Sequence, residues 1–286
     1  MSRVAYVDGQ YLPHRWAAVH IEDRGYQFAD GVYEVIAVVG GRPLDEEPHL
    51  ARLTRSLAEL RIAAPMSNAA LRVVIREVIR RNGARDGILY VQITRGVAAR
   101  DHAFPATARP VLVVTSRRKR PADPRAVDGG VAVITIPDIR WQRCDIKSVA
   151  LLPNVLGKQR AREEGAFEAW QVDREGNVTE GTSTNAWIVT TDATVVTRQA
   201  DSAILNGVTR LAVLDIVRRE RYNFVERPFS VAEAKSAREA FLTSTVVELL
   251  PVVRIDGAPV GNGQPGPLSR KLRECYLAHA SAAGAA

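Results

Sequence analysis

The sequence has little cysteine and no long apolar run, and each absence narrows the class of protein. Only two cysteines, Cys144 and Cys275, occur in 286 residues. They form neither a metal-ligand cluster nor a disulfide framework, so we expect no metal site and no structural disulfide. No apolar run approaches the ~20 residues that span a bilayer, and the start MSRVAYVDGQ lacks the layout of a signal peptide. We therefore expect a cytoplasmic protein with no membrane partner.

The positive charge is dispersed, which argues against nucleic acid as a partner. The net charge of +7 comes from 39 basic residues interleaved with 32 acidic ones. The tight basic run RRKR at 117–120 is typical of a solvated linker. Zinc-finger spacing, an RNP-like aromatic motif and a lysine-rich tail are all absent from the sequence. A non-enzymatic basic binding protein is therefore a weak alternative.

Composition and hydrophobic periodicity predict two domains. The chain is 46% hydrophobic and 25% charged, which is sufficient for two modest cores. Residues 1–118 mix strands with helices and form a small N-terminal α+β domain. Residues 119–128, with prolines and mixed charges, form an interdomain linker. Residues 129–286 form a larger C-terminal domain, so the fold class is α+β or α/β.

Local signals predict several element boundaries. Asp8-Gly9 and Gly40-Gly41 predict turns between strands. Ser67 predicts the N-cap of a helix that ends at Gly83. We expect the last six residues, SAAGAA, to fray.

Lys147 lies among apolar neighbours, although a lysine is a solvated surface residue by default. Cys144, Ile146, Val149 and Leu151 flank it, which predicts a half-buried segment. Desolvation lowers a lysine pKa, and a neutral amine can attack an aldehyde. Lys147 is therefore a candidate Schiff-base lysine.

EGTSTN at 180–185 follows a hairpin turn and precedes the apolar strand AWIV. It could be a polar turn between strands. Alternatively, Glu180 could direct its carboxylate into a pocket, where it would hold a pyridine nitrogen protonated. The neighbouring hydroxyls could then bind a phosphate or a phenolic oxygen.

Three other segments could bind a phosphate. ILNGVTR at 204–210 opens a helix whose first-turn amides attract anions, although capping by Asn206 is the simpler interpretation. Thr243-Ser244-Thr245 follows a strand and could be a phosphate clamp or a plain strand end. Arg52 lies on the helix that begins at Pro48 and is either a phosphate ligand or a surface charge. A nucleotide site has no support, because GxxxxGK[ST] and GxGxxG are both absent.

Arg100 and His102 lie in a loop after a strand. Arginine matches a carboxylate with two parallel hydrogen bonds, and a nearby histidine can add a third donor. The loop is therefore either a carboxylate trap or a solvated basic segment.

Taken in order, these motifs resemble those of the fold-type IV pyridoxal-phosphate aminotransferases, which include the branched-chain and D-amino-acid transaminases. The resemblance covers nearly the whole chain and implies a two-domain fold with pyridoxal 5'-phosphate at the domain interface. It rests on seven segments: DGVYEVI at 30–36, HLARL at 49–53, QITRGVAARDHAFP at 92–105, WQRCDIKS at 141–148, EGTSTN at 180–185, ILNGVTR at 204–210 and TSTVVELLPV at 243–252.

The resemblance implies a role for each candidate residue. Lys147 is the catalytic residue that forms the Schiff base, Glu180 pairs with the pyridine nitrogen, and Arg52 contacts the phosphate. Further cofactor contacts are implied at Ser244, Leu205, Val208, Thr209 and Thr245.

Within the family, Arg100 and His102 resemble the D-amino-acid transaminases, in which this pair binds the substrate α-carboxylate together with Tyr33. Trp141 and Leu205 resemble pocket positions of the same group. The implied reaction is ping-pong transamination of D-amino acids, such as D-alanine, with 2-oxoglutarate or pyruvate. The implied assembly is a homodimer in which the loop with Arg100 and His102 completes the neighbouring subunit's site.

The sequence departs from the family pattern at four positions. Val149 and Ala150 replace an expected Leu-Asn, and Val246 and Val247 stand where hydroxyl residues are common. These changes could reshape the pocket, so substrate breadth stays open. The alternatives on the same fold are a branched-chain L-amino-acid transaminase, an R-selective amine transaminase and aminodeoxychorismate lyase.

Overall fold

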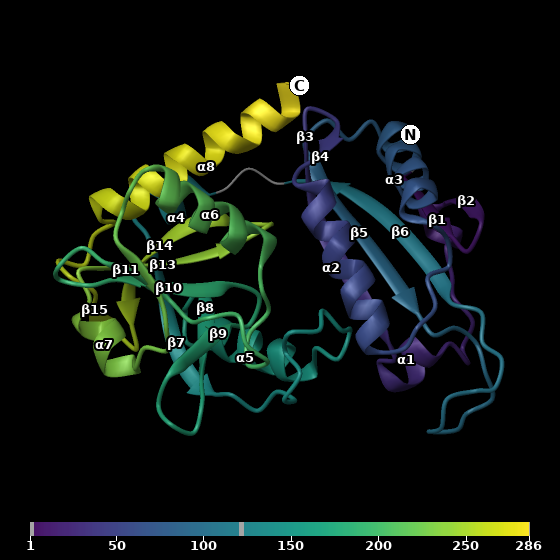
Figure 1. The fold of residues 1–286 in the computed structure, drawn as a ribbon, viewed down its shortest axis with the longest axis horizontal. Helices are drawn as coiled ribbons and strands as arrows, with labels where there is room; N and C mark the ends of the chain where they lie inside the picture. The colour runs from purple at the N-terminus through teal and green to yellow at the C-terminus, as the bar shows by residue number, and fades with distance from the viewer. Residues whose placement is uncertain (1–2, 120–122, 286) are drawn as a thin grey trace. The chain divides into compact units, whose positions relative to one another are not determined.

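The computed structural model describes residues 3–119 and 123–285, which divide into two compact units (Figure 1). Unit 1 holds the described residues of Met1–Arg120, Ile146–Ala150 and Ala280–Ala286. Unit 2 holds those of Pro121–Asp145 and Leu151–His279. The segment that carries Lys147 therefore belongs to unit 1, although both of its flanks belong to unit 2. In the predicted linker, residues 120–122 lie outside the described part of the chain.

Unit 1 contains a six-stranded antiparallel sheet with the order β2-β1-β6-β5-β3-β4. The predicted turns at Asp8-Gly9 and Gly40-Gly41 are confirmed, since they join β1 to β2 and β3 to β4. The strands are β1 Val4–Val7, β2 Gln10–Pro13, β3 Gly31–Val39, β4 Arg42–Pro43, β5 Gly87–Thr94 and β6 Val111–Arg118.

Helices α2 and α3 pack their apolar faces on this sheet and build one core with it. The caps predicted for α3 are confirmed: the Ser67 side chain accepts from Ala70 N at 3.2 Å, and Gly83 adopts the left-handed conformation that ends a helix. The helices of unit 1 are η1 His14–Trp16, α1 Arg24–Phe28, α2 Glu46–Glu59 and α3 Asn68–Asn82.

Unit 2 contains a nine-stranded mixed sheet with the order β12-β11-β10-β13-β14-β7-β8-β9, and β15 pairs with β14. β14 pairs in parallel with β7, and β7 in parallel with β8. The strands are β7 Val131–Pro137, β8 Glu168–Val172, β9 Val178–Gly181, β10 Asn185–Val189, β11 Val195–Thr197, β12 Phe224–Glu226, β13 Glu239–Ser244, β14 Glu248–Ile255 and β15 Ala258–Pro259.

The sheet of unit 2 must curl back on itself. β9 lies at one end of the strand order, yet only residues 182–184 separate it from β10, which is third from the other end. Gly181 N donates to Thr184 O at 2.7 Å across this turn. The curl therefore gathers the end of β9, which carries Glu180, and the start of β10 at one place.

Helices surround the sheet of unit 2 (Figure 1). Within the predicted linker, Pro124–Asp128 forms a short helix, because Asp123 caps it and a proline suits its first turn. No helix in the described ranges is long and apolar enough to cross a membrane. The helices are α4 Pro124–Asp128, α5 Leu152–Glu163, α6 Val208–Arg219, α7 Val231–Ser236 and α8 Pro267–Ala285.

The prediction of a frayed carboxyl terminus is wrong up to Ala285, because α8 continues to that residue. Alanine has the highest helix propensity, which favours the extension. Gly284 also packs closely on the β3–β4 turn: a Cβ atom built on Gly40 would lie 2.7 Å from its carbonyl oxygen. The last residue, 286, lies outside the described part of the chain.

Candidate functional site

Lys147 lies on a short segment that pairs with the start of β3. Tyr33 N donates to Lys147 O at 3.0 Å, and Val149 N donates to Gly31 O at 3.0 Å. The lysine is half-buried, as its apolar neighbours predict. Its Nζ lies 4.3 Å from the centre of the Tyr33 ring, a cation–π contact. The backbone is thus fixed on both sides of the lysine, and the amine lies over the ring of Tyr33.

Tyr90 lies beside Tyr33, and sequence analysis did not identify it. Their ring centres are 5.6 Å apart, and the Tyr90 hydroxyl donates to Gln92 Oε1 at 2.7 Å. Burial, with a further contribution from Tyr33, raises the pKa of Tyr90 to about 12, so its phenol stays protonated. The register between β3 and β5 produces this pair and cannot be read from either strand alone.

Arg52 lies against a fully buried carboxylate. Its Nε donates to Glu34 Oε1 at 2.8 Å, and an Nη atom donates to Glu34 Oε2 at 2.8 Å. His49 Nδ1 lies 2.8 Å from Glu34 Oε2. This bidentate pairing fixes the plane of the guanidinium that sequence analysis assigned to the cofactor phosphate.

Charge explains why this cluster stays ionised at Glu34 and neutral at His49. Burial opposes ionisation of Glu34, but the charge and hydrogen bonds of Arg52, helped by His49, outweigh it and lower the pKa of Glu34 to about 2. Burial lowers the pKa of His49 despite the Glu34 carboxylate. Glu34 was missed, although the alternation of β3 places it on the buried face with Val32 and Ile36. A carboxylate on such a face needs a buried partner.

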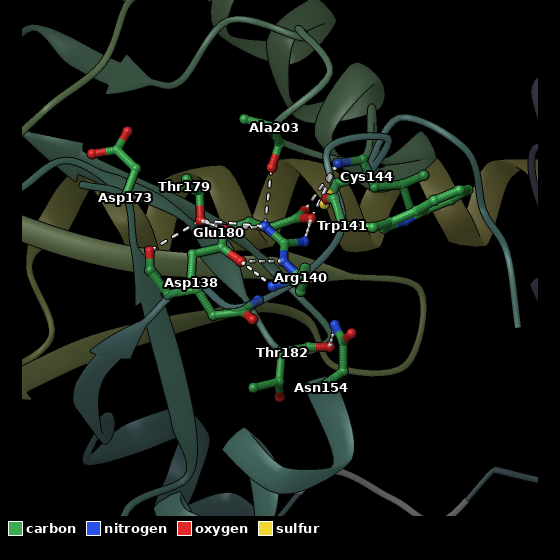
Figure 2. Close-up of polar contacts among 12 residues, drawn as sticks. Asp138, Arg140, Trp141, Cys144, Asn154, Asp173, Thr179, Glu180, Thr182 and Ala203 are labelled. Carbon is green, nitrogen blue, oxygen red and sulfur yellow. Dashed lines mark hydrogen bonds and ion pairs between the residues drawn. The ribbon is translucent and has the colours of Figure 1, made fainter. Parts of the chain in front are cut away.

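Glu180 is buried near the end of β9 and is held by donors from three other segments (Figure 2). Arg140 forms an ion pair with it. Asn185 Nδ2 donates to its Oε2 at 3.1 Å, and Leu205 N lies 3.2 Å from both carboxylate oxygens. The predicted pyridine partner is therefore a carboxylate with a fixed orientation.

Arg140 connects Glu180 to the neighbouring polar groups (Figure 2). It donates to Asp138 at 2.7 Å and 3.0 Å, to Thr179 Oγ1 at 3.3 Å and to Ala203 O at 3.0 Å. Burial disfavours charge on both partners. Even so, Arg140 lowers the pKa of Asp138, and the carboxylates of Glu180 and Asp138 raise the pKa of Arg140. Arg140 is therefore a permanent cation beside Glu180.

The hydroxyls after Glu180 contact a second carboxylate, Glu168, which is fully buried. Ser183 donates to it at 3.0 Å and Thr184 at 3.4 Å, and Thr182 also hydrogen-bonds to it. We expected these hydroxyls to face a phosphate or a phenolic oxygen. They instead anchor the turn between β9 and β10.

Helix α6 begins at Val208 with Gly207 as its N-cap, so the interpretation that Asn206 caps this helix is wrong. Asn206 Oδ1 instead accepts from an Nη atom of Arg210 at 3.2 Å. A Cβ atom built on Gly207 would lie only 2.2 Å from Asn185 Oδ1, so a larger residue does not fit. Because a glycine N-cap brings no capping side chain, this helix start suits an anion. Val208 and Thr209, the predicted phosphate contacts, are buried in this first turn.

The hydroxyl cluster after β13 is divided in its contacts. Thr243 Oγ1 accepts from Trp187 Nε1 at 2.9 Å inside the sheet. Ser244 Oγ accepts from Val247 N at 3.4 Å, and Thr245 is half-buried in the turn before β14. Thr243 is thus structural, whereas Ser244 and Thr245 lie at the end of the strand.

Trp141 is 42% exposed, and its carbonyl accepts from the Cys144 thiol at 3.1 Å. Burial raises the pKa of Cys144 to about 12, so this cysteine is an unreactive thiol.

Arg100 and His102 are exposed and share a contact in unit 1. The Arg100 guanidinium lies 5.2 Å from the centre of the Phe28 ring, and the His102 and Phe28 ring centres are 5.3 Å apart. The structure thus brings the two predicted carboxylate ligands to one aromatic side chain.

The residues fit pyridoxal phosphate on three counts. Lys147 offers a half-buried amine, Glu180 a fixed carboxylate, and the α6 start a glycine position that a Cβ atom would fill. These are the groups that an aldehyde, a pyridine nitrogen and a phosphate require.

The comparisons with known proteins agree with this donor set. Residues 31–255 match the family model described as amino-transferase class IV. The chain is 42% identical over 267 residues to a D-alanine aminotransferase of Bacillus licheniformis, covering 93% of each chain. It is 39% identical over 278 residues to one of Staphylococcus haemolyticus, covering 96% of this chain and 97% of the relative.

Solved structures show the same fold. A branched-chain amino acid aminotransferase of T.th. with pyridoxamine 5'-phosphate superposes with a TM-score of 0.91 at 26% identity, covering 99% of this chain and 95% of that one. The Escherichia coli branched-chain enzyme superposes with a TM-score of 0.87 at 22% identity, covering 97% and 94%. The fold is therefore that of the fold-type IV enzymes, as the motifs predicted. The chain belongs to the class IV aminotransferase family and is a pyridoxal-phosphate-dependent aminotransferase.

A first prediction concerns Gly207. We expect Gly207→Ala to weaken binding of pyridoxal phosphate to the apoenzyme about tenfold or more, because the new methyl group overpacks against Asn185. Absorbance titration of the apoenzyme measures the dissociation constant. The Gly207→Ala, Asn185→Ala double variant should bind no worse than Asn185→Ala alone. If the two losses simply add, this steric account is incorrect.

A second prediction concerns Glu34. Its pKa is depressed from 4.5 to about 2, so it stabilises the fold above pH 4.5, and this contribution is lost as the pH falls towards 2. Glu34→Gln should therefore lower the free energy of unfolding at neutral pH by on the order of 3 kcal/mol. Urea unfolding of the holoenzyme as a function of pH measures the difference, which should narrow below pH 4.5.

Glu77 is the matched control for Glu34. Arg80 and Arg81 lower its pKa to about 2 as well, but this cluster lies at the surface. Solvent and salt screen such pairs, so Glu77→Gln should have a smaller effect that high salt removes. Equal losses for the two variants, or a Glu34 difference that does not change with pH, would contradict the role assigned to the buried cluster.

Proposed function

We propose that this enzyme transaminates D-amino acids such as D-alanine with a 2-oxo acid, 2-oxoglutarate or pyruvate, in a ping-pong reaction. The observation that carries the proposal is the Glu180 carboxylate, buried and oriented by Arg140, Asn185 and the Leu205 amide. The relatives named D-alanine aminotransferase, 42% and 39% identical over nearly their full lengths, support the choice of substrate.

Each half-reaction requires the enzyme to move one proton at the substrate α-carbon. When bound, pyridoxal phosphate supplies the electron sink that makes this proton acidic. Lys147 holds the cofactor covalently at rest and, once displaced by substrate, its amine takes and returns the proton. The position of Lys147 over Tyr33 fixes the direction from which the amine acts.

Glu180 holds a proton on the pyridine nitrogen throughout. A carboxylate keeps a neighbouring base protonated only if it remains ionised itself, and the permanent cation Arg140 favours that state. Arg52, Val208, Thr209, Ser244 and Thr245 hold the phosphate, and Leu205 contacts the cofactor ring. The fixed guanidinium of Arg52 and the glycine N-cap of α6 support these roles.

Arg100, His102 and Tyr33 hold the substrate carboxylate, which selects the D-isomer, and Trp141 borders the side-chain pocket. A carboxylate fixed at one side leaves only one isomer with its α-proton towards Lys147. The clustering of Arg100 and His102 on Phe28 supports a joint role.

A donor panel tests the choice of isomer. D-alanine should convert the bound cofactor to its amine form at least about a hundredfold faster than L-alanine or L-leucine, because the wrong isomer leaves the buried polar groups unpaired. The visible absorbance of the holoenzyme follows the conversion. Conversion by L-leucine alone would indicate the branched-chain alternative. Preference for an amine without a carboxylate would indicate an amine transaminase, and pyruvate release from aminodeoxychorismate without an amino acceptor would indicate the lyase.

We also propose a cytoplasmic homodimer in which the loop carrying Arg100 and His102 completes the partner's site. Large apolar side chains are exposed on both units, which supports burial in an assembly. They include Trp16, Ile21, Tyr26, Ile139, Leu152, Val155 and Leu156.

Mixing two inactive variants tests the shared site. Lys147→Ala lacks the catalytic amine, and Arg100→Ala lacks the carboxylate ligand. Refolding them together at equal amounts should restore about a quarter of wild-type activity, because half of the dimers are hybrids with one intact site each. The measurement is D-alanine turnover, with each variant refolded alone as the control. No recovery despite hybrid formation would mean that each subunit builds its own site.

A further inference from the structure

A buried charge cluster lies at the base of the loop that carries Arg100 and His102. Asp30 Oδ2 accepts from Arg24 Nε at 2.8 Å and from Arg95 Nε at 2.7 Å. Arg24 is only 3% exposed, and Arg95 is 6% exposed. Burying an arginine costs free energy that a partner must offset, so the second half of each guanidinium needs a structural explanation.

Arg24 uses that second half on the loop backbone. Its Nη1 donates to the carbonyl oxygen of Asp101 at 2.6 Å, and its Nη2 lies 3.4 Å from that of His102. The same guanidinium lies 4.8 Å from the centre of the Phe28 ring, on which Arg100 and His102 also lie. One buried fork thus holds the peptide groups at the centre of the predicted carboxylate trap.

Arg95 secures the next part of the loop in a similar way. It donates to the carbonyl oxygens of Leu60 at 2.8 Å and Arg61 at 2.9 Å, after the end of α2. Its guanidinium also lies 3.7 Å from the centre of the Phe104 ring. Arg95 therefore ties the loop to the helical layer, whereas Arg24 contacts the residues around the trap.

The rest of the loop has little to hold it. Residues 99–104 are all exposed, and this stretch contains neither helix nor strand. A carboxylate trap works only if its donors keep their positions, and a loop without a packed core does so only through backbone anchors. Charge-assisted hydrogen bonds from a buried guanidinium are the strongest anchors of that kind.

We propose that Arg24 is a positioning residue for substrate specificity: held by Asp30, it fixes the backbone at Asp101 and His102 so that Arg100 and His102 can bind the substrate carboxylate. This inference rests on the proposed function of that pair. Arg24 itself touches neither cofactor nor substrate. Its loss should therefore affect binding of the carboxylate and leave the cofactor site unchanged.

The test uses the Arg24→Gln holoenzyme with two matched donors, D-alanine and D-alaninamide, of which only the first has a carboxylate. We expect KM for D-alanine to rise at least about tenfold, which corresponds to the loss of a charge-assisted hydrogen bond. The rate with D-alaninamide, the visible spectrum and the affinity for pyridoxal phosphate should stay within about twofold of wild type. Backbone hydrogen exchange of residues 97–110 should become faster.

Two variants guard the interpretation. Arg24→Lys keeps a charge beside Asp30 but lacks the planar fork, so it should give the same selective rise in KM even if Arg24→Gln does not fold. Arg109→Gln is the control, because this side chain lies in the same loop, is 81% exposed and pairs at the surface with Asp8. It should leave KM unchanged.

Arg100→Ala separates failure of this inference from failure of the proposed function. If Arg100→Ala leaves KM for D-alanine unchanged, the carboxylate trap itself is wrong. If Arg100→Ala raises KM while both Arg24 variants leave it unchanged, Arg24 has no positioning role. Equal losses with D-alanine and D-alaninamide in the Arg24 variants would also overturn the proposal, because they would show general damage to the fold.

Discussion

The buried ion pair between Arg140 and Glu180 is the interaction on which the chemistry of unit 2 depends. Arg140 also binds Asp138, Thr179 and the carbonyl of Ala203, so one guanidinium joins the segment after β7, strand β9 and the loop that leads to α6. An isolated buried carboxylate would take up a proton. The cation keeps Glu180 ionised and also fixes where its oxygens lie.

Unit 1 uses the same arrangement with the charges exchanged. There the group assigned to the ligand is the cation Arg52, and the buried partner is the anion Glu34. In both units a neighbouring neutral side chain, Asn185 or His49, adds a further hydrogen bond to the carboxylate. Such pairs contribute little net stability after desolvation, so what they provide is a defined orientation.

The sequence predicted the ligand-facing residues better than their supports. Lys147, Glu180 and the α6 start lie in short local motifs, and local signals also predicted the α3 caps and the hairpin turns. Asp138 and Arg140 lie some forty residues before Glu180, and only the curl of the sheet brings them together. The capping of α6 was misjudged for a similar reason, since the side chain that crowds Gly207 comes from β10.

Arg24 shows what this separation means for substrate choice. The side chains that would meet the carboxylate are on an exposed loop, where sequence can vary without disturbing a core. The group that holds their backbone is buried and tied to Asp30, where a change leaves a charge without its partner. Because Arg24 donates to carbonyl oxygens, which every residue has, it can hold the loop whatever side chains the loop carries. The fold therefore separates the position of the trap from its chemistry, so the side chains that face the substrate can be exchanged while the anchor stays in place.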